Sequence, residues 1–193
     1  MGKKMDQRVR LTRNLLKNAL VQLMQKQHIT KISVRALCEV ADINRSTFYV
    51  HYTDQYDLLK KVEQEVLENL NKYLGSQDLN KDLPMSVQVL TKVLDYVKEN
   101  MELFKALLSE NCDVAFQKDL MKLTQVLSSQ QNQSLTAKIQ EYAETFFLTG
   151  AISMLQKWLH GGANESPAQM AEFVIQIIYY GINGVKENTS VTS

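Results

Sequence analysis

The chain has 193 residues, of which 45% are hydrophobic and 22% are charged. Its length suits a small module joined to a larger body, and its composition is ordinary for a soluble globular protein. Only seven Gly and two Pro are present to interrupt helices, so the composition favours helices over strands. We therefore expect an all-α fold.

Several classes of protein lack support in the sequence. Cys38 and Cys112 lie far apart and have no flanking ligand residues, which argues against a metal site and a disulfide framework and fits a reducing cytoplasm. The charged first ten residues precede no apolar run, and no uncharged stretch is long enough to cross a bilayer, so we expect neither a signal peptide nor a membrane span. There is no Gly-rich phosphate loop, nucleophile motif or obvious carboxylate pair, so we expect no cofactor and no enzymatic activity.

The net charge of +1 is unevenly distributed along the chain. Residues 1–61 contain twelve Lys and Arg against five Asp and Glu, whereas the remainder contains ten against sixteen. All five arginines lie at or before Arg45. The planar fork of the Arg side chain suits phosphates and guanine edges, so the N-terminal third is interpreted as the part that faces a polyanion. Without a DNA-binding motif in this third, a solvated basic surface would be the better interpretation.

The N-terminal third also carries the signals of short helices. Residues 1–8 are predicted to form a basic arm, and apolar residues at three- and four-residue spacing over 9–25 predict an amphipathic helix. A loop at 27–30 is followed by Ser33, which is a good N-cap for a second, short helix. The inner face of that helix is expected to consist of Ala36, Leu37, Val40 and Ala41.

Asp42 follows the second helix, where a sharp turn requires a residue in the left-handed conformation. Asn44 is placed to cap a third helix over 45–52, whose length of roughly 12 Å fits a major groove. Two short helices joined by such a turn form a helix-turn-helix, in which the second helix reads the DNA.

Residues 8–59 resemble the DNA-binding domain of TetR-family transcriptional regulators. Members open the second helix with Thr or Ser, turn with a sequence like Ala-Gly-Val-Ser, and carry Thr-Leu-Tyr before an aromatic residue that closes the third helix. The matching positions here are Ser33, 41–44, Thr47, Phe48, Tyr49 and Tyr52. The resemblance implies an N-terminal three-helix DNA-binding domain with a helix-turn-helix, followed by a larger helical ligand-binding and dimerisation domain.

Two positions depart from the family pattern. Asp42 replaces the usual Gly of the turn, which costs on the order of 1 kcal/mol and puts a negative charge near DNA. Gln55 replaces a Lys that commonly touches a phosphate in this family. Gln can still donate a neutral hydrogen bond, so a weaker phosphate contact is expected there.

Eight residues are predicted to contact DNA. Arg45 can bind guanine bidentately, and Ser33 offers the amides of a helix N-terminus to a phosphate. Tyr49 and His51 resemble family positions that touch phosphate, whereas Val50 either meets a thymine methyl group or is simply exposed. Phe48 is expected to point inward. The complete predicted set is Ser33, Arg45, Ser46, Thr47, Tyr49, Val50, His51 and Gln55.

A long connecting helix is predicted to begin at Asp54, and the polar stretch 75–84 is the best boundary in the chain. We accordingly divide the chain into a DNA-binding domain, 1–53, a connecting helix, 54–74, and an effector-binding and dimerisation domain, 75–193. Within the last part, helices are predicted at 86–99, 102–108, 113–127, 135–160 and 167–184, with a loop at 128–134.

The helix predicted at 167–184 is apolar on more than one face, so it must be buried on more than one side. Together with 145–155 it predicts a two-helix face that packs against a second copy, as in the family. A wholly intramolecular core is the alternative. The predicted interface residues are Met154, Phe173, Ile177, Ile178, Gly181 and Ile182.

In most of the family the helical body encloses a pocket for a small effector. Aromatic and Met residues at helical spacing are more often core than pocket, and no charge cluster identifies a ligand. The candidate lining residues are Phe104, Leu107, Met121, Tyr142, Phe146 and Trp158.

The resemblance implies a sequence-specific transcriptional regulator, a repressor that binds a palindromic operator in double-stranded DNA as a homodimer and is released by a small-molecule effector. An activator, a regulator controlled by a protein partner, and an architectural module without sequence specificity are the alternatives. Regulation through oxidation of Cys112 also stays open.

Overall fold

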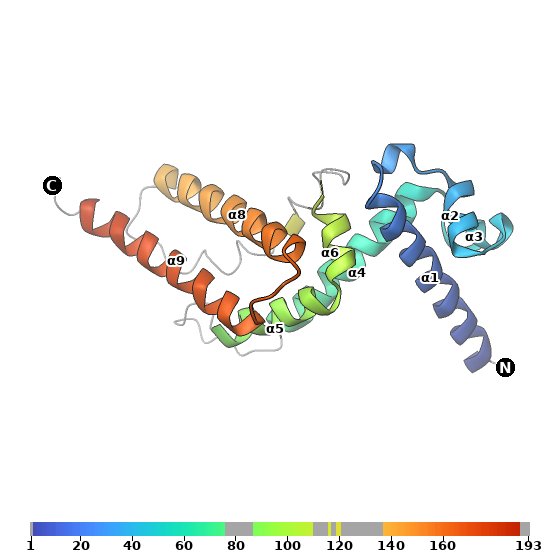
Figure 1. Cartoon of the computed structure of the whole chain (residues 1–193), viewed down its shortest axis with the longest axis horizontal. Helices are drawn as coiled ribbons and strands as arrows, with labels where there is room; N and C mark the ends of the chain where they lie inside the picture. The colour runs from blue at the N-terminus through green and yellow to red at the C-terminus, as the bar shows by residue number, and fades with distance from the viewer. Residues whose placement is uncertain (1, 76–86, 110–115, 117–118, 121–136, 190–193) are drawn as a thin grey trace. The chain divides into compact units, whose positions relative to one another are not determined.

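The computed structural model describes residues 2–75, 87–109, 116, 119–120 and 137–189 (Figure 1). Within these ranges every regular element is helical, which confirms the all-α prediction. The elements are α1 (Gly2–Met24), a 3-10 turn, η1 (Ile29–Lys31), α2 (Val34–Ala41), α3 (Arg45–His51), α4 (Gln55–Gly75), α5 (Val87–Glu99), α6 (Met101–Leu107), α8 (Ala137–His160) and α9 (Pro167–Thr189).

The chain divides into two compact units. Unit 1 comprises Met1–Glu68 and Glu102–Phe116, and unit 2 comprises Asn69–Met101 and Gln117–Ser193. Most of α4 and α6 therefore belong to unit 1, and the last turns of α4 belong to unit 2. The predicted functional domains, 1–53, 54–74 and 75–193, are a separate division of the chain and stay a prediction.

Unit 1 is built around the buried face of α1, where Leu16, Leu20 and Met24 are almost fully inaccessible. Helix α1 packs on α2, and α2 on α3 (Figure 1). An ion pair between Lys17 and Glu65, 3.0 Å long, joins α1 to α4. The remaining core side chains of this unit include Leu37, Cys38, Ala41, Phe48, Tyr52, Leu58, Leu59, Val62, Val66, Leu103, Phe104, Leu107, Leu108 and Phe116.

The prediction for the inner face of α2 was wrong at one position. Val40 is 41% exposed, whereas Cys38 is buried. At about 100° per residue, the buried face is centred among Leu37, Cys38 and Ala41, and Val40 falls beyond its edge. The eight-residue pattern of α2 alone did not distinguish these two orientations of the helix.

Several helix boundaries also differ from the predictions. The predicted basic arm, 1–8, is helical from Gly2 and continuous with α1. The reader helix α3 ends at His51, because Tyr52 is its extended C-cap. Helix α4 begins at Gln55, since Asp54 accepts a 2.8 Å hydrogen bond from the amide of Asp57 and so caps it.

Unit 2 is organised around α9, which packs along α5 and also contacts α8. Helices α8 and α9 run antiparallel on either side of a short corner (Figure 1). The corner confirms the predicted stop at Gly161 and Gly162: Gly162 has φ +89°, and Ala163, also left-handed at φ 49°, is buried. The amide of Ala163 donates a 2.9 Å hydrogen bond to the carbonyl of Trp158.

The start of α9 confirms the predicted capping box. The amide of Gln169 donates to Ser166 Oγ at 3.2 Å, and the amide of Ser166 donates to Gln169 Oε1 at 2.9 Å. The two bonds satisfy amides that the helix itself leaves unpaired. The helix then extends to Thr189, five residues beyond the predicted end at 184.

Two further predictions concern segments largely outside the described residues. Of the helix predicted at 113–127, the structure describes Phe116, Asp119 and Leu120, which are helical. The loop predicted at 128–134 lies wholly outside the described residues.

Candidate nucleic-acid interface

The turn between α2 and α3 is held by local hydrogen bonds. Ser33 Oγ accepts a 3.1 Å bond from the amide of Ala36 and caps α2. Asp42 ends α2 in the left-handed conformation (φ 53°, ψ 47°), as its position predicted. Asn44 Oδ1 accepts a 2.9 Å bond from the amide of Ser46 and caps α3. These caps satisfy free helix amides and set the direction in which α3 leaves the turn.

Phe48 fixes the rotation of α3 about its own axis. Its ring is fully buried, meets the ring of Tyr49 edge-on at 5.5 Å and lies 5.6 Å from the ring of Tyr52. The predicted inward orientation of Phe48 is confirmed. Because one face of a seven-residue helix is thus anchored, the opposite face must point to solvent.

The outward face of α3 carries most of the predicted DNA contacts. Tyr49 and Val50 are 59% and 76% exposed, and Arg45 and Ser46 are exposed as well. Arg45 makes no hydrogen bond or ion pair with any described residue, so its fork of donors is available to a ligand.

The remaining predicted contacts are less accessible or already engaged. Ser46 Oγ donates a 2.9 Å bond to Asn44 Oδ1, which leaves its oxygen as an acceptor. Thr47, His51 and Gln55 are half-buried, whereas Ser33 is exposed. The structure therefore places all eight predicted contacts in unit 1 but presents them to solvent to different degrees.

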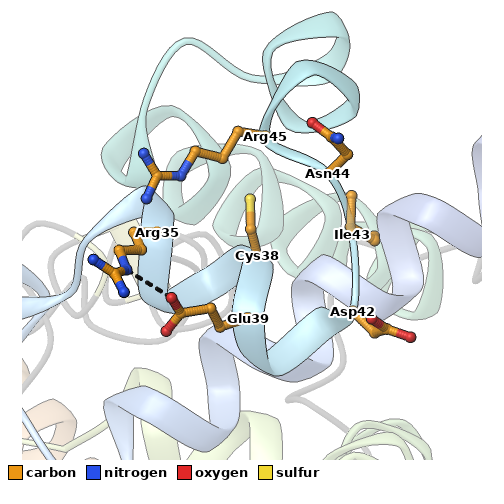
Figure 2. Close-up of a pocket in the computed structure, with 7 residues that line it drawn as sticks. All are labelled: Arg35, Cys38, Glu39, Asp42, Ile43, Asn44 and Arg45. Atoms are coloured by element: carbon orange, nitrogen blue, oxygen red, sulfur yellow. Dashed lines mark hydrogen bonds and ion pairs between the residues drawn. The ribbon is translucent and has the colours of Figure 1, made fainter.

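A pocket of about 500 Å³ opens between α2 and the start of α3 (Figure 2). Two arginines, Arg35 and Arg45, line it together with two acids, Glu39 and Asp42. Arg35 Nε donates a 2.6 Å bond to Glu39 Oε1, drawn as the dashed line in Figure 2, and this contact raises the pKa of Arg35. The other lining residues are Cys38, Ile43 and Asn44.

Sequence reasoning did not select Arg35 or Glu39 as site residues. Their four-residue spacing on α2 was the available signal, because an exposed Arg and Glu one turn apart form an ion pair. Their position beside Arg45 followed only from the angle between α2 and α3. Cys38, at the same pocket, is buried, and burial raises the pKa of its thiol although Arg45 opposes the shift.

The C-terminal end of α3 is tied to α4 by Lys61. Its Nζ donates to the carbonyl of His51 and to Asp57 Oδ2, both at 3.0 Å, and lies 5.0 Å from the centroid of the Tyr52 ring. Asp57 also accepts a 3.0 Å bond from the amide of Thr53. That backbone bond, with Lys61 second, lowers the pKa of the Asp57 carboxyl. The carboxylate therefore holds the loop and the lysine together.

The predicted effector-pocket residues lie in different surroundings. Phe104 and Leu107 are buried in unit 1. In unit 2, Trp158 is buried and its indole donates a 3.3 Å bond to the carbonyl of Glu165, whereas Tyr142 and Phe146 are 63% and 72% exposed. Met121 lies outside the described residues. A role in effector binding stays a prediction for all six.

Exposed apolar side chains gather on α8 and α9. Phe173 and Ile177 on α9 are about half exposed. Tyr142 and Phe146 on α8 and Tyr180 on α9 are more exposed still. The three- and four-residue spacings within each helix place these residues on one face of that helix. Of the other predicted interface residues, Met154 is half-buried on α8, and Ile178, Gly181 and Ile182 belong to the later turns of α9.

The described part of the chain shows neither a metal-binding cluster nor a membrane-spanning helix. No group of three or more His, Cys, Asp or Glu residues in that part is arranged to hold a metal ion. No helix there is long and apolar enough to span a bilayer.

Comparison with known proteins identifies the family of the C-terminal region. A family model of the TetR group, described as a transcriptional regulator C-terminal region, matches residues 86–180. An uncharacterized HTH-type transcriptional regulator, YxbF of Bacillus subtilis (strain 168), is 22% identical over 166 residues, which cover 84% of this chain. The matched part spans 43% of the length of that curated relative.

Solved structures share the fold. A TetR transcriptional regulator from Streptococcus agalactiae 2603V matches with a TM-score of 0.65 and 19% identity over 92% of this chain and 99% of that one. NalD, the secondary repressor of the MexAB-OprM multidrug efflux pump in Pseudomonas aeruginosa, matches with a TM-score of 0.59 and 17% identity over 91% and 97%. The helix-turn-helix of unit 1 agrees with the family match: residues 86–180 belong to a family of transcriptional regulator C-terminal regions of the TetR group, and the chain as a whole is similar to TetR-family regulators.

Proposed function

We propose that this protein binds double-stranded DNA sequence-specifically through α3 and represses transcription from a palindromic operator. The observation that carries the proposal is the fixed orientation of α3. Phe48 anchors its inner face while Arg45, Tyr49 and Val50 point outward from a capped turn. The excess of Lys and Arg over residues 1–61 supplies the attraction to phosphates that such a reader requires.

The protein acts as a homodimer in this proposal. One short helix reads only a few base pairs, whereas two symmetric copies read a palindrome and roughly double the specific free energy. Phe173 and Ile177 on α9, with Met154 on α8, supply an apolar surface for the second copy. Such exposed side chains at regular spacing suit a self-complementary interface.

A small-molecule effector then sets the affinity for the operator. An effector that binds one dimer geometry better shifts the population toward it by its differential binding energy, and a geometry with mismatched reader helices releases DNA. NalD, a structural neighbour, is a repressor, and this supports repression over activation only by similarity of fold. The free thiol of Cys38 fits the cytoplasm as the compartment in which this occurs.

Selection of bound sequences from a random duplex pool, using the full chain, tests the proposal. We expect a palindrome whose half-sites are separated by one or a few helical turns. Equal affinity for random duplex and for every selected sequence would exclude a specific reader and favour an architectural module. With the operator known, addition of candidate effectors shows whether release accompanies binding. A transcription assay that shows activation would overturn the repressor assignment.

Arg45→Ala is expected to weaken operator binding by about 1–3 kcal/mol and to relax base preference at one position per half-site. The reason is the loss of a bidentate contact from a side chain that has no described intramolecular partner. Arg45→Lys is the matched control, since it keeps the charge but removes the fork. It should keep nonspecific affinity and still lose the base preference. Unchanged base preference in both variants would show that Arg45 does not contact a base.

Glu39→Gln is expected to strengthen nonspecific DNA binding. The slope of log affinity against log salt concentration should become steeper by about the amount that one additional phosphate contact contributes. The substitution removes a negative charge from the pocket beside Arg45 and frees Arg35 from its 2.6 Å ion pair. Affinity measured against salt concentration gives the slope. Glu99→Gln, an equal change of charge on α5, is the control and should leave both quantities unchanged.

A further inference from the structure

The pocket between α2 and α3 is lined by equal numbers of cationic and anionic side chains. Arg35 and Arg45 carry positive charges and Glu39 and Asp42 carry negative charges, so the formal charges cancel. A site for an anion such as a phosphate carries an excess of positive charge. The balance of charge at this pocket instead favours a neutral ligand that is recognised by its hydrogen-bonding groups.

Glu39 engages Arg35 through one particular nitrogen. Arg35 Nε donates the 2.6 Å hydrogen bond to Glu39 Oε1, and the two side chains stay 71% and 63% exposed. A guanidinium group has five N–H bonds, one on Nε and four on the two terminal nitrogens. The terminal nitrogens of Arg35 make no hydrogen bond or ion pair with any residue that the structure describes. Glu39 therefore holds the guanidinium group and leaves its terminal fork free.

Arg45 presents a second fork at the same pocket. It is the first residue of α3 and is exposed. In Figure 2 the guanidinium groups of Arg35 and Arg45 extend toward the same side of the pocket, whereas Asp42 points away from both. Helices α2 and α3 thus each supply one arginine fork to a common surface.

We propose that Glu39 determines specificity by positioning Arg35, so that the terminal fork of Arg35 binds a second guanine in the half-site that Arg45 reads. The proposal rests on the proposed DNA-binding function. In the major groove, the O6 and N7 atoms of guanine accept two N–H bonds from one arginine. Two forks on one surface therefore read two G·C pairs in each half-site.

The carboxylate of Glu39 makes Arg35 discriminate between a base and a phosphate. A backbone phosphate at the fork would bring its negative charge close to that of Glu39, and the two charges would repel each other. The edge of guanine is neutral and meets no such repulsion. Because phosphates are common to all DNA sequences, this repulsion lowers nonspecific affinity relative to specific affinity.

The first test compares base preferences, measured by selection of the full chain and its variants on a random duplex pool. The wild type should select guanine at two positions of each half-site. Arg35→Ala and Glu39→Ala should lose the preference at the same position, by about 5- to 150-fold, which is the range for one bidentate pair. Glu39→Gln, which keeps an acceptor oxygen, should retain more of the preference than Glu39→Ala.

A double variant shows whether Glu39 acts through Arg35. In the Arg35→Ala background, Glu39→Ala should cause no further loss of base preference, because the side chain that Glu39 positions is absent. A further loss would overturn the positioning role. Thermal unfolding should be nearly the same in all variants, since an exposed ion pair one turn apart contributes little to stability. Glu99→Gln on α5 is the control and should keep every base preference.

A modified base tests the atoms of the contact. In 7-deazaguanine a C–H group replaces the N7 acceptor, so this base at the position assigned to Arg35 should weaken binding of the wild type and leave binding of Arg35→Ala unchanged. Free guanosine offers the same edge without a DNA backbone and should not displace the operator. Displacement by guanosine would show that the pocket binds a nucleoside and would overturn the assignment to DNA.

The outcomes for Glu39 and for the proposed function differ. Selection of a specific operator with a guanine preference that Arg35→Ala and Glu39→Ala leave intact overturns the role of Glu39, and the proposed function stands. Absence of any sequence selection by the wild type overturns both.

Discussion

Ile177→Glu is expected to convert a dimer into monomers and to abolish measurable operator binding at concentrations where the wild type is saturated. Ile177 is 46% exposed on α9, so the glutamate is tolerated in the isolated chain. In a self-complementary interface the change recurs on both copies, and two buried, unpaired carboxylates oppose association. Specific binding exceeds nonspecific binding by about 4–10 kcal/mol, so loss of one half-site removes about half of that range.

Analytical ultracentrifugation gives the oligomeric state, and a duplex titration gives the affinity. Phe173→Glu, one turn earlier on the same helix, should act alike. Gln88→Glu on the exposed side of α5 adds the same charge and is the control, with both properties unchanged. A wild-type protein that is monomeric at all concentrations would contradict the expected dimer. An Ile177→Glu variant that stays dimeric would show that the dimer interface does not include the face of α9 that carries Ile177.

Phe48→Ala is expected to destabilise unit 1 by about 3–5 kcal/mol, the range for removal of a large buried aromatic side chain. Phe48 is fully buried and contacts the rings of Tyr49 and Tyr52, so the substitution leaves a cavity under α3 and removes the contact that sets its rotation. Urea unfolding followed by circular dichroism measures the loss. Operator binding should fall together with stability.

Val50→Ala is the matched control for that loss, because Val50 lies on the same helix but is 76% exposed. Its free energy of unfolding should change by less than about 0.5 kcal/mol, the usual range for surface positions. Equal destabilisation by the two substitutions would show that the inward and outward faces of α3 are not distinguished as described.

The local parts of the helix-turn-helix were predictable because their causes lie within a few residues of sequence. The Ser33 side chain accepts a hydrogen bond from the amide three residues later, and the Asn44 side chain accepts one from the amide two residues later. Asp42 adopts the left-handed conformation that ends α2. The capping box of Ser166 and Gln169 is equally short-range. Such bonds depend on the local chain alone, so the order of residue types predicts them.

The orientation of side chains about short helices was less predictable. The pattern of α2 did not separate Val40 from Cys38, because a helix of two turns offers too few positions to define its buried face. The beginning of α1 was placed too late, at residue 9 instead of Gly2, since a basic segment with few apolar residues resembles an arm even when it continues a helix.

By itself the sequence determined the helical class, the caps of α2, α3 and α9, and the match to the TetR pattern, because each depends on composition or on spacing within one or two turns. Only the tertiary structure decided which residues from different helices meet. Lys61 reaches the carbonyl of His51 ten residues away, and Arg35 shares a pocket with Arg45, because of how unit 1 packs. Helix packing sets these contacts through buried apolar side chains, and no local rule relates the polar groups that it brings together.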